Sequence, residues 1–188
     1  MIDPENPRAT DLERFRGYLY VLAGRHAGRR RQGKADASDV VQQTLVQALA
    51  ALSQFRGTSD AELAAWLRQI LARQLANAAR DLGRQKRDIT RERSLEAALD
   101  QSASRLEVFL AAADSSPSQK AQRSEQLLRL AEALAELPDA QREAIVLHHL
   151  EQKSLEEIGG QMDRTAAAVA GLIKRGLRAL RLSLQEPG

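Results

Sequence analysis

Three clusters of basic side chains have the clearest chemistry in this sequence, because guanidinium and ammonium groups bind phosphates. They are Arg25, Arg29, Arg30, Arg31 and Lys34; Arg68, Arg73, Arg80, Arg84, Lys86 and Arg87; and Arg164, Lys174, Arg175, Arg178 and Arg181. The net charge of the 188 residues is only +3, because 25 acidic residues offset most of the 28 basic ones, and seven of the acidic residues lie in the stretch from Glu132 to Glu157. Basic clusters separated by an acidic stretch predict a polyanion bound at more than one place. For the first cluster, a solvated loop is an equally good interpretation.

Other chemistries find little support. His148 and His149 are adjacent, so on a helix they point about 100 degrees apart and cannot easily share a metal ion. Surface or packing roles are the better interpretation for both. The sequence suggests no set of serine, histidine and acid, and no glycine-rich phosphate loop. We therefore expect no catalytic residue, no metal site, no cofactor and no enzyme activity.

The chain contains no cysteine, which excludes disulfides, cysteine zinc ligands and a thiol nucleophile. No apolar run approaches the roughly 18 residues that a membrane span needs, and the N-terminus lacks a signal-peptide core. These features predict a soluble, cytoplasmic protein without membrane insertion.

The composition predicts an all-α protein, since aromatic residues are scarce and strong helix formers abound. Apolar residues at helical spacing predict amphipathic helices from Asp11 to about Arg25, from the cap at Asp36–Ser38 to Leu52, and from Ser59 onward. The last of these has an apolar stripe that includes Trp66. We expect Trp66 to belong to the core, with contact to a nucleic-acid base as the alternative. On the other face basic residues recur, and DNA contact is favoured there over a solvated surface.

From about Ser94 to Ser124 the periodicity weakens and serines are frequent. This predicts two small helical domains, residues 1–95 and 124–188, joined by a flexible linker over residues 96–123. A short helix from Leu106 to Ala113 is a possible element of that linker.

The second domain is expected to end in a helix-turn-helix. A helix that stops at Pro138 is followed by one through Ala144, Leu147 and Leu150. Ser154 and Glu157 then predict a capping box for a short helix. Asp163 would take the left-handed turn conformation, and Thr165 would cap a long basic helix.

The core stripe of that long helix predicts its exposed face. If Val169, Leu172 and Ile173 point inward, one set of residues must point outward. This set comprises Ala167, Ala170, Gly171, Lys174, Arg175 and Arg178.

Four segments, in this order, resemble the extracytoplasmic-function sigma factors of bacterial RNA polymerase, and the resemblance covers nearly the whole chain. DASDVVQQT (36–44) is similar to the polymerase-binding helix, and FRGTSDAELAAWLRQIL (55–71) to the stretch that leads into promoter melting. LPDAQREAIVLHHLEQKSLEEIGGQM (137–162) resembles the start of the second conserved domain, and TAAAVAGLIKRGLRALR (165–181) its recognition helix. The short linker also fits, because this group is similar to larger sigma factors without their middle domain.

The resemblance implies that the chain binds core RNA polymerase, through the clamp coiled coil of β′ and the β flap, and directs promoter-specific initiation. It leaves open whether an anti-sigma protein also binds. The residues expected to contact the clamp are Asp39, Val40, Gln42, Gln43, Thr44 and Gln47.

The resemblance also implies two DNA contacts. The residues expected at the minus-ten element are Arg68, Arg73, Gln74, Asn77, Arg80, Arg84 and Lys86. Those expected at the minus-thirty-five element are Arg164, Thr165, Ala167, Ala170, Gly171, Lys174, Arg175 and Arg178.

Four positions depart from the family's pattern. Relatives commonly carry Asn where this chain has Gln74, and Asp where it has Asn77. Ala170 and Gly171 stand where relatives often have polar or basic residues, and they cannot hydrogen-bond to bases through side chains. Base reading would then fall on Lys174 and Arg175, together with apolar contacts to thymine methyls and DNA shape.

Two other functions stay open from the residues alone. The first is a dimeric helix-turn-helix transcriptional regulator that does not depend on core polymerase, which would leave residues 36–44 and the basic helix without a task. The second is a helical adaptor for an acidic partner, for which salt-dependent promoter binding would be absent.

Overall fold

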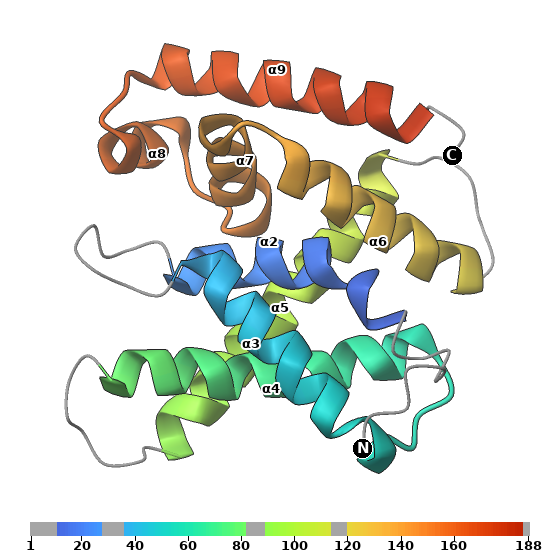
Figure 1. Cartoon of the computed structure of the whole chain (residues 1–188). Coiled ribbons are helices and arrows are strands. Elements are labelled where there is room, and N and C mark those ends of the chain that lie inside the picture. Colours follow the sequence, from blue (N-terminus) through green and yellow to red (C-terminus); the bar gives the residue numbers. More distant parts are fainter. Residues whose placement is uncertain (1–10, 28–35, 82–88, 114–119, 186–188) are drawn as a thin grey trace. The chain divides into compact units, whose positions relative to one another are not determined.

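The structure is a computed structural model that describes residues 11–27, 36–81, 89–113 and 120–185, all drawn as coloured ribbon in Figure 1. The described residues contain helices and no strand, so the all-α prediction is confirmed. The chain divides into two compact units, Met1–Gln101 and Ser102–Gly188.

The first unit contains α2 (Arg16–Ala27), α3 (Ala37–Ala50), the short 3-10 helix η1 (Leu52–Gln54), α4 (Asp60–Asp81) and the first half of α5 (Ile89–Ala113). Helix α3 packs against both α2 and α4, as Figure 1 shows. Phe15, Tyr18, Leu45, Leu67 and Leu71 are buried and form much of the core. The apolar stripes predicted for these helices are therefore the faces on which they meet.

The second unit contains the second half of α5, α6 (Lys120–Glu136), α7 (Asp139–Ile145), the π-helical turn η2 (Val146–Leu150), α8 (Leu155–Met162) and α9 (Ala166–Gln185). Helix α9 lies across α6, α7 and α8. Gly176 lets α7 come close, because a Cβ there would stand 2.6 Å from the Ile145 Cδ1 atom. This packing fixes which face of α9 is left for a partner.

The segment expected to be an irregular linker is largely helical. Helix α5 continues to Ala113 and α6 begins at Lys120, so only residues 114–119 of the expected linker lie outside the described residues. The frequent serines led to the prediction of an irregular segment. The better signal was that residues 89–113 contain neither glycine nor proline, the residues that most disfavour a helix. Leu99, Ala103, Leu106 and Leu110 recur at four- and three-residue steps and are all buried. The domain bounds 1–95 and 124–188 stay predictions.

Candidate nucleic-acid and protein interfaces

The turn between α8 and α9 has the geometry of a helix-turn-helix. Asp163 takes the left-handed conformation, with φ 54° and ψ 52°, as its position in the sequence predicts. The Arg164 amide donates to the Gly159 carbonyl at 2.9 Å. A Cβ at Gly159 would stand 2.6 Å from the Arg164 carbonyl oxygen, so only glycine fits this close approach. The turn therefore sets the angle at which α9 leaves α8.

Side-chain caps fix the start of both helices. Ser154 and Glu157 form the predicted capping box: the Glu157 amide donates to Ser154 Oγ at 3.2 Å, and Glu157 Oε2 accepts from the Ser154 amide at 2.8 Å. The hydrogen bond from the Ser154 amide is the main reason that the pKa of the Glu157 carboxyl lies below its usual value. At α9 the Ala168 amide donates to Thr165 Oγ1 at 3.2 Å, which confirms the predicted cap.

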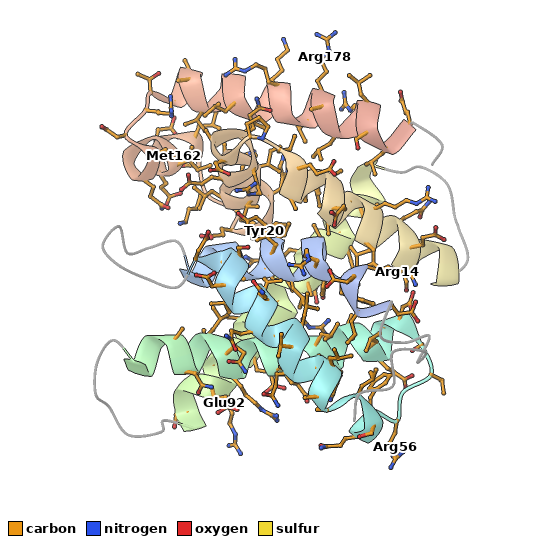
Figure 2. All side chains as sticks on the ribbon, in the orientation of Figure 1. Arg14, Tyr20, Arg56, Glu92, Met162 and Arg178 are labelled. Carbon is orange, nitrogen blue, oxygen red and sulfur yellow. The ribbon has the colours of Figure 1, made fainter. Side chains whose placement is uncertain are left out.

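The outward face of α9 has the composition that its stripe predicts. Val169, Leu172 and Ile173 are buried, while Ala167, Ala170, Lys174, Arg175 and Arg178 are exposed. Gly171 is half-buried, beside the Arg175 guanidinium. In Figure 2 Arg178 points away from the rest of its unit. Arg164 and Thr165, at the start of this face, are also exposed. The face is cationic and open to a partner, whereas contact with a minus-thirty-five element stays a prediction.

Helix α4 presents its two described arginines differently. Arg68 is half-buried: its Nε donates to Asp100 Oδ1 at 2.6 Å and its Nη1 to the Tyr18 hydroxyl at 2.8 Å. Burial works against the charge, but Tyr18 and Asp100 outweigh it, so the pKa of Arg68 lies above its usual value. Arg73 is exposed, and its Nε donates to Glu92 Oε1 at 3.2 Å. Both arginines are thus engaged by carboxylates of α5, which the sequence interpretation did not anticipate.

The remaining residues expected at the minus-ten element are only partly described. Gln74 and Asn77 are half-buried on α4. Arg80, Arg84 and Lys86 lie outside the residues whose side chains the structure describes. Exposed Gln69 and Arg73 share one side of α4 with Trp66 and Asn77, since these positions recur at three- and four-residue steps. Arg68 falls outside this stripe, on the flank that faces Tyr18.

Trp66 is neither fully buried nor open. It is half-buried, with its ring centroid 5.3 Å from that of Phe55, which is also half-buried. The prediction that Trp66 belongs to the core is therefore right only in part. The loop that carries Phe55 is fixed by Glu62, whose Oε2 accepts from the Thr58 and Ser59 amides at 2.8 and 3.1 Å.

Two of the six residues of α3 that were expected to contact the polymerase do not lie on the protein surface. Val40 and Thr44 are buried, and Thr44 Oγ1 donates to the Val40 carbonyl at 2.7 Å. Neither side chain can meet a partner, because both lie on the stripe that packs against the core. The other four, Asp39, Gln42, Gln43 and Gln47, are exposed on the opposite side.

One residue of this α3 face was missed. Val46 is 61% exposed, although it is a large apolar residue, and it lies one turn from Gln42 and Gln43. The signal in the sequence was its absence from the buried stripe of α3. We call the exposed residues Asp39, Gln42, Gln43, Val46 and Gln47 the α3 surface. This surface has one charge and an apolar centre, the composition of a protein contact rather than of a phosphate contact.

The two histidines have packing roles. The His149 ring lies 4.7 Å from that of Phe109, and His148 Nδ1 is 3.0 Å from the Lys153 carbonyl oxygen. Burial, and then the neighbouring His148, lower the pKa of His149. No group of three potential metal ligands occurs in the part of the chain that the structure describes. None of the helices within the described ranges is long and apolar enough to cross a membrane.

Comparisons with known proteins match both units. The family model described as Sigma-70 region 2 matches residues 12–85, which include α2, α3 and α4. The family model described as Sigma-70, region 4 matches residues 127–180, which include most of α6 to α9. A search of curated proteins finds no match. Two regions of one family occur here in sequence order and together account for more than half of the chain, and we conclude that it belongs to the sigma-70 family.

Proposed function

We propose that the chain is an RNA polymerase sigma factor of the extracytoplasmic-function kind, which binds core polymerase and directs it to specific promoters. The observation that carries this proposal is the match to regions 2 and 4 in one chain. The chain acts by binding, without catalytic activity of its own, on the chromosomal DNA of the bacterial cytoplasm.

The α3 surface is the proposed contact with the clamp coiled coil of the β′ subunit. Exposed glutamines offer amide donors and acceptors, and Val46 offers an apolar centre that loses water on contact. Asp39 lies in the first turn of α3, where a negative charge is favoured by the helix dipole. This surface contains no basic residue, so it would not compete for DNA.

The outward face of α9 is the proposed contact with the minus-thirty-five element. Lys174 and Arg175 are the candidates for hydrogen bonds to base edges in the major groove, and Arg178 for a phosphate. Ala167 and Ala170 leave room for the groove wall to approach and can contact thymine methyls. Region 4 would also meet the β flap of the polymerase.

The exposed side of α4 is the proposed contact with the minus-ten element, through Arg73 and Asn77, together with Arg80, Arg84 and Lys86 farther along the chain. Unstacking bases costs roughly a few kcal/mol per step, as in other proteins that extrude bases. Cationic contacts offset part of this cost. Because the two DNA-binding regions are tethered, binding of one raises the effective concentration of the other at its site. Each can therefore bind weakly while the pair binds well.

A pull-down with core RNA polymerase tests the proposal against a dimeric regulator independent of the polymerase. We expect the purified chain to form a stable complex with core enzyme, and that complex to bind a genomic promoter fragment that the chain alone binds weakly. Strong and specific binding of DNA by the chain alone, without affinity for core enzyme, would support the regulator instead.

A further inference from the structure

Helix α5 carries a stripe of acidic residues toward α4. Glu92, Glu96 and Asp100 recur at four-residue steps, so they lie on one side of the helix. The first and last of them pair with arginines: Glu92 Oε1 is 3.2 Å from Arg73 Nε, and Asp100 Oδ1 is 2.6 Å from Arg68 Nε. The first half of α5 therefore brings carboxylates to the arginines that distinguish α4 as a cationic helix.

The two pairs differ in how easily they can open. The Arg68 side chain is 17% exposed and also donates to Tyr18, so Asp100 holds α5 to a fixed guanidinium. The Arg73 side chain is 60% exposed and that of Glu92 is 22% exposed, so solvent and other anions reach this pair from the arginine side. Exposed ion pairs are weak and exchange readily. Asp100 thus keeps α5 beside α4, and Glu92 is the carboxylate that another anion could replace.

We propose that the first half of α5 is an intramolecular competitor for nucleic acid, in which Glu92, positioned by Asp100, occupies the Arg73 guanidinium until a DNA phosphate displaces it. This proposal rests on the proposed function, because it concerns the same face of α4. It adds a regulatory contact: region 2 in the free chain binds DNA less tightly than its arginines alone would.

The chemistry of the exchange is direct. A carboxylate and a phosphate offer similar pairs of oxygens to the planar guanidinium, so they compete for one donor fork. Salt screens the exposed Arg73–Glu92 pair, so the competition from Glu92 is strongest at low ionic strength. Removal of the carboxylate should therefore raise the affinity for single-stranded DNA most at low salt.

The test measures binding of the full chain to a fluorescent 20-nucleotide single-stranded DNA of mixed sequence, over a series of salt concentrations. Glu92→Gln should raise the affinity at low salt roughly two- to fivefold, as expected for one exposed pair. This gain should shrink as the salt concentration rises, because salt screens the Arg73–Glu92 pair. Asp100→Asn should give a smaller gain in the same direction, because Glu92 is then less well positioned.

The matched control is Glu107→Gln, which removes the same charge from an exposed residue of the same helix. If Glu92→Gln and Glu107→Gln change the affinity and its salt dependence equally, only net charge matters and the proposal is overturned. Thermal melting of each variant shows whether a change in binding comes from unfolding instead. Glu92→Asp keeps the charge but shortens the side chain, so it should raise the affinity less than Glu92→Gln does. If the wild-type chain binds neither core polymerase nor DNA, the proposed function fails, and this proposal with it.

Discussion

The cationic helices α4 and α9 differ in what their basic side chains contact within the chain. On α9, Lys174, Arg175 and Arg178 are exposed, and no ion pair with a described carboxylate involves them. On α4, Arg68 and Arg73 each pair with an acid of α5. Basic residues at helical spacing look alike in a sequence, whereas their availability depends on a neighbouring helix. In the proposed function, α9 would therefore bind DNA directly, whereas Arg73 of α4 would first exchange Glu92 for a phosphate.

The largest effect is expected on α9. Reversing Arg175 and Arg178 together to Glu should lower promoter affinity roughly a hundredfold or more, because each base or phosphate contact contributes about 1–3 kcal/mol. Core-polymerase binding should be unchanged, since the α3 surface is intact. Gel shift of a promoter fragment with core enzyme measures the first, and a pull-down the second.

The control is the double variant Arg123→Glu, Arg129→Glu, which changes the net charge by the same amount. Both residues are exposed on α6 of the same unit. Equal losses in the two double variants would mean that α9 has no special role. The single changes Arg175→Ala and Arg73→Ala sharpen the comparison. Arg73→Ala should lower the affinity for promoter DNA less than Arg175→Ala does, because Arg73 loses its ion pair with Glu92 when it binds DNA.

The turn that orients α9 offers the next effect. Gly159→Ala should destabilise the second unit by about 1–3 kcal/mol, because its Cβ would stand 2.6 Å from the Arg164 backbone oxygen. The neighbouring Gly160→Ala is the control: nothing lies within 4 Å of its added Cβ, and alanine favours a helix. Chemical denaturation should therefore show opposite signs for the two variants. A loss of the same size in both would contradict the geometry of the turn.

The α3 surface should respond separately from both DNA helices. Val46→Asp places a charge at the apolar centre of this surface and should weaken core-polymerase binding roughly tenfold. Val108→Asp is a matched control, since Val108 on α5 is 69% exposed. Fluorescence titration of core enzyme measures both. Unchanged affinity in Val46→Asp would remove Val46 from the interface, while Asp39→Ala with Gln43→Ala would still test the rest of it.

The smallest effect concerns pH. The pKa of His149 is lowered from 6.5, first by burial, so the unfolded state binds its proton at a higher pH than the folded state does. Stability should therefore fall as the pH drops below 6.5, by at most about 1.4 kcal/mol per pH unit for one proton. Urea unfolding of the wild type and of His149→Phe, which keeps a ring against Phe109, measures this. The same pH dependence in both would assign it to other groups.

Much of this architecture is predictable from local rules. Capping residues, a left-handed turn residue and one apolar stripe were enough to place the start, the turn and the outward face of α9, because each acts within a few residues. The helix expected from Leu106 to Ala113 is the end of α5, whereas the helical residues 96–105 of α5 were missed because serines weighed more than the absence of glycine and proline. Val40 and Thr44 were assigned to a partner although their own stripe buries them.

The contacts of Arg68 and Arg73 could not be predicted from the sequence. Arg68 is 32 residues from Asp100 and 50 from Tyr18, and such pairs depend on how helices pack rather than on periodicity. No helix was predicted over residues 96–105, so there was no reason in the sequence to place Asp100 beside Arg68. The half-buried position of Trp66 likewise depends on a loop that brings Phe55 to its ring.

Run-off transcription with purified core polymerase tests the central claim most directly. Core enzyme and the wild-type chain should start transcripts at defined sites of a genomic library, whereas core enzyme alone should not. The Arg175→Glu, Arg178→Glu double variant should lose those starts while it still binds the enzyme. If the wild-type chain binds core polymerase and yet starts no transcript at any site, the account is contradicted.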